Sequence, residues 1–353
     1  MTGPHGIWQH ANLETPDPSF GTCTDDVARA LTVDLLHRRT LGWEAVAPSA
    51  ARSLDYLSEA FEPATGMFHD FRDAGGGWID EAGSQDCQGR AVLSLGIAAR
   101  EAPEVAMRAR ARSMLGLAMP AARRLTSPRA VASAILGCEA ALDGDADGHA
   151  RHTFDHLLRL LAGTFAQVDL DGDWPWPEEE LTYENALLPH ALIVAGCRLD
   201  DADLRARGLL VLDWIIATQM SRRGMFTPVG NDGWWPRGRE RHRWDQQPIE
   251  ATALILACAA AYDATRDPGY RRAAEAGYAW FLGDNEAGLV VAEVATGGCH
   301  DGLAEDHVNL NQGAESTLMW LTAVEAMRGL RARASGRGSP TPAVGPVLSG
   351  TRS

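Results

Sequence analysis

The strongest constraint on the fold of this chain is a strict alternation between two kinds of helical segment. Apolar residues recur at the i, i+3 and i+4 spacing of a helix in about eleven segments, whereas the alternation typical of strands is nearly absent. One kind of segment is rich in alanine and leucine on nearly all faces, which is typical of a buried helix. These segments cover about 25–38, 86–100, 128–142, 182–197, 247–262 and 313–328.

The other kind is amphipathic and carries arginine on one side, which predicts helices that face solvent. These segments cover about 47–61, 103–123, 149–165, 201–220 and 268–282. A chain that alternates buried and exposed helices can close into a ring with the buried helices inside. We therefore predict an all-α (α/α)6 toroid in which one outer helix is missing, or in which residues 1–20 take its place irregularly. The alternative is an open solenoid, whose repeats are more regular in length than these.

We expect residues 1–330 to form a single (α/α)6 barrel domain. The clearest short strand candidate is 289–294. After residue 330 the chain becomes rich in glycine, serine, proline and arginine, which predicts a disordered tail over 331–353.

The composition excludes several classes of protein. The formal net charge is −15, so nucleic acid and anionic membranes are not expected partners. The chain contains no lysine, which excludes Schiff-base chemistry and lysine-linked pyridoxal phosphate. No apolar run approaches a membrane span, and the first residues lack the features of a secretory signal, so we expect a cytoplasmic protein. The 6 cysteines are scattered singly and are expected to be reduced and buried.

The connections between helices are asymmetric. Turns that leave a buried helix are short, whereas the segments that enter one are mostly long: 62–85, 166–181, 221–246 and 283–312. Long structured loops in a compact domain tend to carry function. In a closed ring these loops gather over the N-termini of the inner helices, where the helix dipoles present positive potential.

The first two helix entrances place charge where a buried helix begins. Asp25 and Asp26 follow Thr24, and one of these residues can cap the helix while another complements its dipole. The second entrance follows Trp78, and there Asp86, Gln88 and Arg90 interrupt an otherwise apolar helix. A buried charge is costly without partners, so we expect these side chains to face a pocket. The third entrance, Thr126 to Arg129, looks like an ordinary cap with proline in the first turn.

The later entrances add aromatic and amide side chains. Trp174-Pro175-Trp176-Pro177 cannot be helical, and its indoles suit stacking on a sugar or, alternatively, a hydrophobic lid. The next entrance carries Trp235 and the run Asp245-Gln246-Gln247, with Glu250 about one turn inside the helix. Before the last helix, glycines 297 and 298 permit a close approach of the backbone to a ligand.

Five entrances thus bring carboxylates, amides and aromatic rings to one mouth of the predicted ring. Glycosidic cleavage needs two carboxyl groups in different environments, so a carbohydrate pocket is predicted. The candidate catalytic residues are Asp25, Asp26, Asp86, Asp245 and Asp301. The candidate substrate-binding residues are Arg29, Trp78, Arg90, Trp176, Tyr183, Asn185, Trp235, Gln246, Gln247, Glu250, His300, Asn311, Gln312 and Glu315. No cofactor or metal is expected, because Cys299-His300 lacks a convincing third zinc ligand motif.

Six stretches together resemble a bacterial family of (α/α)6-barrel proteins that are often fused to, or encoded beside, glycosyltransferases and mannoside phosphorylases. They are Cys23–Ala30, Gly83–Arg90, Leu181–Ala186, Asp245–Ala251, Gly297–Leu303 and Asn311–Thr317. The resemblance implies a six-hairpin glycosidase-like fold, a carbohydrate ligand and a possible glycosyltransferase partner. The chain departs from the family pattern at four positions, where Gln85 replaces Glu, Gln88 replaces His, Glu184 replaces Asp and His300 replaces Arg.

Three functions remain open from the sequence. The first is a glycoside hydrolase in which Asp86 or Asp245 is the general acid, and Asp25, Asp26 or Asp301 is the base or nucleophile. The second is a non-catalytic glycan-binding or partner module for a glycosyltransferase. The third is a sugar 2-epimerase or lyase, which needs bases such as histidines on both sides of a carbon. The loss of a carboxylate at Gln85 raises the further question of whether this chain is inactive.

Overall fold

The computed structural model describes residues 1–336, and there the two classes of helix alternate as predicted. The inner helices are α1 (Thr24–Leu41), α3 (Gln85–Glu101), α5 (Pro128–Ala141), α7 (Leu187–Leu199), α9 (Pro248–Thr265) and α11 (Ala314–Ala334). The outer helices are α2 (Trp43–Ala60), α4 (Val105–Ala122), α6 (His149–Ala166), α8 (Ala202–Gln219) and α10 (Pro268–Phe281). A 3-10 turn, η1 (Leu142–Gly144), follows α5.

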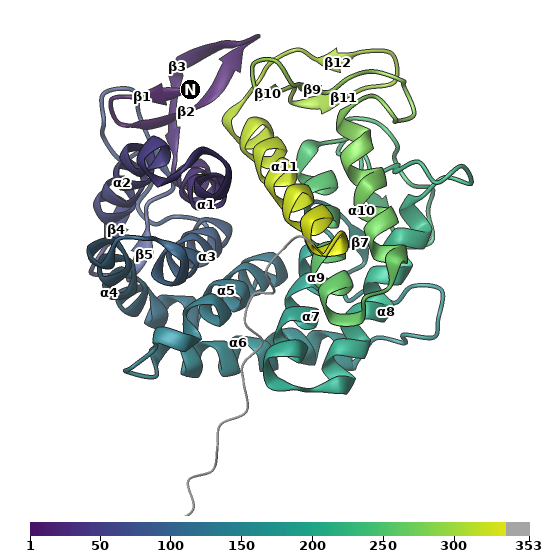
Figure 1. Cartoon of the computed structure of the whole chain (residues 1–353), viewed down its shortest axis with the longest axis horizontal. Coiled ribbons are helices and arrows are strands. Elements are labelled where there is room, and N and C mark those ends of the chain that lie inside the picture. Colours follow the sequence, from purple (N-terminus) through teal and green to yellow (C-terminus); the bar gives the residue numbers. More distant parts are fainter. Residues whose placement is uncertain (337–353) are drawn as a thin grey trace, which may run out of the picture.

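The inner helices close into a ring (Figure 1). Each one packs against the next, and α11 packs back onto α1, so the chain is a toroid and not an open solenoid. Each outer helix lies against the inner helix that precedes it, from α2 on α1 to α10 on α9. The (α/α)6 prediction is therefore confirmed, with one outer helix missing after α11 in the described residues.

The alanine and glycine content of the inner helices has a packing reason. Where α3 crosses α5, a methyl group on Gly96 would overlap the backbone carbonyl of Gly137, and one on Gly137 would overlap that of Val92. The two backbones approach too closely for a side chain between them. Small residues thus let six helices fit side by side around a narrow ring.

Residues 6–23 form a β-hairpin, with a short strand at 2–3 beside it, and not an irregular substitute for a helix. Strands β1 (Thr2–Gly3), β2 (Gly6–Asn12), β3 (Thr15–Cys23) and β6 (Phe71–Arg72) make an antiparallel sheet in that order. Strand β2 packs against α1, α2 and α11, so the hairpin covers the place where the ring lacks a helix (Figure 1). The sequence did not predict this hairpin. Both of its faces are partly exposed, so apolar and polar residues do not alternate along its strands with a clean period of two.

Short strand pairs brace the long loops over the mouth. They are β4 (Phe61–Glu62) with β5 (Met67–Phe68), β7 (Glu180–Leu181) with β8 (Trp235–Pro236), β9 (Ala292–Glu293) with β10 (Gly298–Cys299), and β11 (Gly302–Leu303) with β12 (Val308–Asn309). The strand predicted at 289–294 is reduced to β9. Helix α11 continues to Ala334, so residues 331–334 are helical and not part of a disordered tail as predicted; residues 337–353 lie outside the described part.

Two expectations from composition can be compared with the described residues. None of their helices combines the length and the apolar character that a bilayer span requires. All cysteines are free thiols, and five are buried, whereas Cys197 is exposed, contrary to expectation.

Candidate active site

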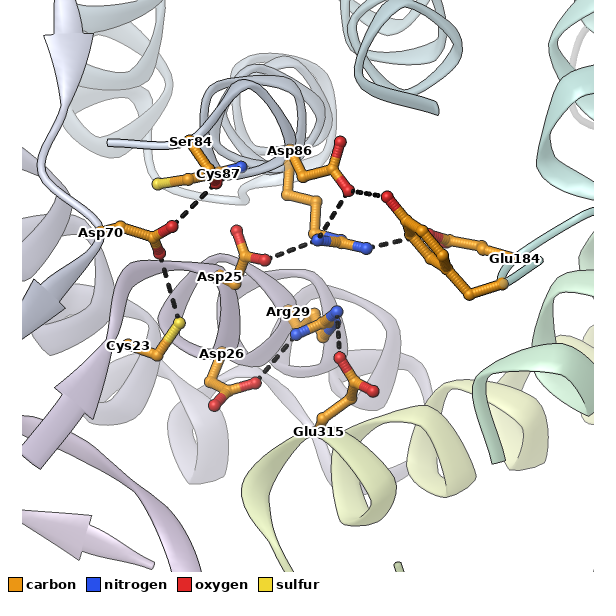
Figure 2. A network of polar contacts seen from close by, with 12 residues as sticks. Cys23, Asp25, Asp26, Arg29, Asp70, Ser84, Asp86, Cys87, Glu184 and Glu315 are labelled. Carbon is orange, nitrogen blue, oxygen red and sulfur yellow. Dashed lines mark hydrogen bonds and ion pairs between the residues drawn. The ribbon is translucent and has the colours of Figure 1, made fainter. Parts of the chain in front are cut away.

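The N-termini of the inner helices meet at one mouth of the ring, where an arginine that is largely buried joins three of the six entrances (Figure 2). Arg90, in α3, donates from Nη1 to Asp25 Oδ2 at 2.5 Å and from Nη2 to Glu184 Oε2 at 3.0 Å. Asp25 lies in the first turn of α1, and Glu184 lies in the loop that precedes α7. The predicted convergence of separate entrances is thereby confirmed.

A second buried arginine closes the ring at its seam. Arg29, in α1, donates from Nη1 to Asp26 Oδ1 at 2.9 Å and from Nη2 to Glu315 Oε2 at 2.6 Å. Glu315 lies in the first turn of α11, so this pair connects the first and last helices of the toroid (Figure 2). The side chain of Asp26 is 3% exposed, whereas that of Glu315 is 44% exposed.

Beside these arginines is a cavity of about 350 Å³, a size that fits a small ligand. Six of its lining residues were predicted as site residues: Asp25, Asp26, Arg29, Gln247, Asp301 and Glu315. The others are Gln9, His10, Cys23, Asp70, Phe71, Gly313 and Ser316. The N-terminal hairpin contributes Gln9 and His10, so the unpredicted β-sheet forms part of the wall.

Burial dominates the acid–base properties of the cavity carboxyl groups. It raises the pKa of Asp26 to about 7, although the Arg29 guanidinium acts in the opposite direction. Burial also raises the pKa of Asp301, while hydrogen bonds from the Gly313 N–H and Ser316 lower it. The pKa of Asp70 is raised by burial and then by the neighbouring Asp25 carboxylate. The site therefore holds carboxyl groups in unlike electrostatic settings.

Asp86 faces the arginine network, but it does not line the cavity. Its Oδ2 accepts a hydrogen bond from Tyr183 Oη at 2.5 Å and lies 3.9 Å from Arg90 Nη1, while Oδ1 accepts from Ser127 Oγ at 3.3 Å. Burial raises the pKa of the Tyr183 hydroxyl. Asp86, Tyr183 and Arg90 thus form one connected polar cluster beside the cavity.

The third entrance is more than the ordinary cap that was predicted. Arg129, one residue into α5, is buried, and its guanidinium lies 4.7 Å from the centroid of the Tyr183 ring. It donates from Nε to the Tyr183 carbonyl at 2.5 Å and from Nη1 to both carboxylate oxygens of Glu178. Arg129 therefore holds the segment that carries Tyr183. The sequence did not predict this role, because Arg129 follows a proline in what looked like an ordinary first helical turn.

Glu250 and Asn185 form a fully buried brace beneath this segment. Glu250 accepts the backbone N–H of Glu184 through Oε1 and the Asn185 side-chain amide through Oε2, the latter at 3.0 Å. Asn185 also bonds both the N–H and the carbonyl of Thr182, so its amide is committed to the loop. Burial raises the pKa of Glu250 to about 7, and the hydrogen bonds from Asn185 and Glu184 oppose this shift. These two predicted binding residues therefore support the mouth from below.

Three predicted amide residues serve the loops. Gln246 is buried with its side chain turned toward α10, where Oε1 accepts from Trp280 Nε1 at 2.7 Å. Asn311 Oδ1 accepts the Leu13 N–H at 2.9 Å, and the Gln312 N–H donates to the Leu13 carbonyl at 2.9 Å. These bonds fasten the hairpin tip to the loop before α11, so the structure uses Asn311 and Gln312 to close the seam.

Asp245 and His300 lie at the rim, outside the cavity lining. Asp245 has a positive φ of 55°, and its Oδ2 accepts from Asn231 Nδ2 at 2.9 Å. It lines a separate hollow with residues 302–310. His300 Nδ1 lies 3.2 Å from the Leu310 carbonyl. The Asp245 carbonyl accepts the Asn231 N–H, and the next residue, Gln246, pairs through its backbone with Leu303 of β11.

The predicted tryptophans pack mainly on other aromatic rings. Trp176 is buried and stacks on Trp214 of α8, and Trp235 stacks on the same ring, so the structure favours the hydrophobic-lid alternative for this cluster. Trp234, one residue earlier, is the indole that lies against Tyr183, with ring centroids 6.3 Å apart. Trp78 stacks on His69 at 5.2 Å.

Two departures from the family pattern lie away from the cavity. Gln85 is exposed, and its Oε1 accepts the N–H groups of Thr126 at 2.6 Å and Ser127 at 2.9 Å. Gln88 is buried and bonds the backbone of Phe68, Gly66 and Ala118, so it does not face the pocket as expected. A glutamate at position 85 would accept the same two N–H groups, so this replacement removes no carboxylate from the cavity.

Asp70, Glu184 and His10 were missed by the sequence analysis. Asp70 lies between β5 and β6 in a long loop with other acidic residues, and nothing in its neighbourhood distinguishes it. Glu184 was noted only as a departure, although its positive φ of 50° and its bond to Arg90 place it in the network. His10 lies in β2, so its place in the cavity wall could not be predicted without the hairpin.

Comparison with solved structures identifies the architecture. The chain is similar to a D-mannose isomerase (TM-score 0.70, 12% identity, covering 93% of this chain and 92% of that one). It is also similar to the cellobiose 2-epimerase of Bacillus thermoamylovorans B4167 (TM-score 0.71, 12% identity, 94% and 93% covered). A third neighbour is an α-mannanase of glycoside hydrolase family 76 from Bacteroides thetaiotaomicron (TM-score 0.65, 9% identity, 89% and 88% covered).

The chain shares the (α/α)6 barrel fold of these neighbours. At these identities the likeness shows the fold alone. No protein-family description matches the sequence, and no curated protein is similar to it.

Proposed function

We propose that this chain is a carbohydrate-active enzyme that cleaves a glycosidic bond with two carboxyl groups of the mouth cavity. The observation that supports this most directly is the cavity itself, in which carboxyl groups from both sides of the ring seam surround a space of about 350 Å³. Neighbouring folds include enzymes named for action on mannose, cellobiose and mannan. A sugar is therefore the substrate class that best fits both the fold and the polar lining.

Asp301 is assigned as the general acid. Burial raises its pKa, and among the described residues no arginine forms an ion pair with it, so its protonated form persists to higher pH than that of an exposed aspartate. This assignment differs from the sequence-based choice of Asp86 or Asp245, neither of which lines the cavity.

Glu315 is assigned as the base or nucleophile. The Arg29 guanidinium lies 2.6 Å from it, and the first turn of α11 favours negative charge. Its side chain is 44% exposed, so water and substrate can reach it. Asp26 and Gln247, which line the same cavity, are expected to bind sugar hydroxyls.

The assignment is tested on the purified full chain with mannosides and glucans, with and without phosphate, and with product analysis by NMR. We expect turnover in which Asp301→Asn and Glu315→Gln each lower kcat by about 10²- to 10⁴-fold. Asp203→Asn, which changes an exposed carboxyl group on outer helix α8, is the matched control and should retain activity. Full activity of Asp301→Asn, or loss of turnover in Asp26→Asn alone, would contradict the assignment.

Epimerisation is the second candidate, because a cellobiose 2-epimerase shares the fold over nearly the whole chain. However, His10 is the only histidine among the cavity-lining residues, so a pair of histidine bases does not face this space. Deuterium incorporation at C2 of a reducing sugar in D₂O would favour epimerisation over hydrolysis.

A glycan-binding partner of a glycosyltransferase is the non-catalytic alternative, and it rests on the motif resemblance. Calorimetry that shows tight glycan binding without product formation would favour it. Co-purification of the chain with a glycosyltransferase would support the association.

A further inference from the structure

Four side chains that can ligate metal ions lie together at the edge of the cavity: Cys23, Asp25, Asp70 and Cys87 (Figure 2). One ligand atom from each of Asp25, Asp70 and Cys87 lies within 4.8 Å of the other two. Cys23 Sγ is 3.4 Å from Asp70 Oδ1 and extends the group to four. Both thiols are buried.

The backbone fixes the positions of these residues. Cys23 is followed by the first turn of α1, and the β3–β6 ladder pairs it with Phe71, the residue after Asp70. The Thr24 N–H donates to the Asp70 carbonyl at 2.8 Å. Cys87 lies in the first turn of α3, where its N–H is capped by Ser84 Oγ at 3.0 Å. Cys23, Asp25 and Cys87 are therefore held by regular structure, and the backbone of Asp70 is held by its hydrogen bond to Thr24.

One oxygen in this group has no partner. Asp25 Oδ2 accepts from Arg90, but Asp25 Oδ1 is buried and forms no hydrogen bond. Figure 2 shows that this second oxygen faces the side of the network on which Asp70 and Cys87 lie. A buried carboxylate oxygen without a donor is costly, so the site favours a cation at this point.

The charges around Asp70 lead to the same conclusion. Its Oδ2 accepts from Ser84 Oγ at 2.8 Å, and its Oδ1 accepts from the Cys23 thiol. Within residues 1–336 no arginine or histidine forms an ion pair with Asp70, while Arg90 pairs with Asp25 but not with Asp70. Two neighbouring carboxylates thus share one cation.

We propose that Cys23, Asp25, Asp70 and Cys87 form a binding site for a divalent transition metal ion, with Zn²⁺ as the best match. Two thiolates and two carboxylates suit four-coordinate zinc, whereas Mg²⁺ and Ca²⁺ prefer all-oxygen sites. Arg90 and Ser84 would hold the outer carboxylate oxygens, as partners of metal ligands commonly do. Binding releases the two thiol protons to solvent.

The site borders the cavity, because Cys23, Asp25 and Asp70 also line it. Its existence is independent of the proposed glycosidic reaction, since the four ligands do not include Asp301 or Glu315. It would also give two of the cysteines a role beyond hydrophobic packing, whereas Cys138 and Cys258 remain ordinary buried thiols.

Cobalt titration tests the proposal on the reduced, metal-depleted full chain. Co²⁺ should bind one per chain and produce a thiolate-to-cobalt charge-transfer band together with intense visible bands of four-coordinate geometry. Added Zn²⁺ should displace it and raise the Tm. Absence of a stoichiometric charge-transfer band at micromolar Co²⁺ would overturn the proposal.

Variants locate the site. Cys87→Ser and Asp70→Asn should weaken Co²⁺ binding by at least about 100-fold while the far-UV circular dichroism of the metal-depleted protein stays native. Cys197→Ser removes the one exposed thiol of the described residues and should leave the band unchanged. If the band disappears in Cys197→Ser and persists in Cys87→Ser, the metal binds adventitiously and the proposal is wrong.

Discussion

At the scale of single residues, burial and pairing decide which carboxyl group can do what. Asp301 and Glu315 line one cavity. Burial raises the pKa of Asp301, whereas Glu315 forms an ion pair with Arg29. Both side chains are carboxylic acids. Their neighbours, contributed by distant parts of the chain, make the difference.

The acid role of Asp301 predicts a pH dependence. A general acid acts in its protonated form, so kcat/KM should fall as pH rises through the raised pKa of Asp301. A pH–rate profile with the best glycan substrate measures this limb. In Asp301→Asn the limb should disappear from the residual activity, and its persistence there would exclude Asp301 as the group that titrates.

Arg90 predicts a large loss of stability when it is removed. Arg90→Met leaves Asp25 and Glu184, whose side chains are only 14% and 17% exposed, without their shared cation, so the free energy of unfolding should fall by about 3 kcal/mol. Arg110→Met is the control, because its pair with Asp55 is exposed and should contribute at most about 1 kcal/mol. Urea unfolding compares them, and equal losses in the two variants would contradict the network.

At the scale of secondary-structure elements, each helix was visible in the sequence, while the contacts between elements were not. The apolar periodicity placed all eleven helices, with the largest errors at the start of α7 and the end of α11. The crossing of α3 and α5 through Gly96 and Gly137, however, depends on which faces of the two helices meet. The hairpin of β2 and β3 likewise depends on the seam that it covers.

The α3–α5 crossing predicts opposite effects for two helical glycines. Gly96→Ala should destabilise the chain by more than about 2 kcal/mol, because its methyl group meets the α5 backbone. Gly116→Ala, in α4, meets no atom within 4 Å and should stabilise by roughly 0.5–1 kcal/mol through helix propensity. Thermal and urea unfolding measure both variants. A stable Gly96→Ala protein would show that the two helices can separate at little cost.

At the scale of the whole molecule, the buried brace under the mouth couples stability to pH. The folded pKa of Glu250, about 7, lies above its ordinary value of 4.5, so folding retains a proton that the unfolded chain releases. Its contribution is present in full below about pH 4.5 and is lost as pH rises through 7.

We therefore expect the free energy of unfolding to fall by on the order of 2 kcal/mol between about pH 5 and 7.5 on account of Glu250. Glu250→Gln cannot titrate, so its unfolding free energy should depend less on pH over this interval. The variant should also be less stable overall, because a Gln amide turns a donor toward Asn185 or Glu184. An unchanged pH dependence in Glu250→Gln would contradict the raised pKa.

The sequence alone determined the helices, their inner or outer class and the helix entrances at which the polar residues gather. Local periodicity carries this information, because every helix must bury one stripe or its whole surface. The packing of α11 on α1 decided that the ring closes. Tertiary structure decided which polar residues face the cavity. Gln246, Asn311 and Trp176 have the same character as the residues that line this cavity, yet Gln246 bonds Trp280, Asn311 bonds the Leu13 N–H and Trp176 stacks on Trp214. Asp70 and His10 reach the cavity only because β6 and β2 pair with β3, a long-range contact that no local pattern encodes.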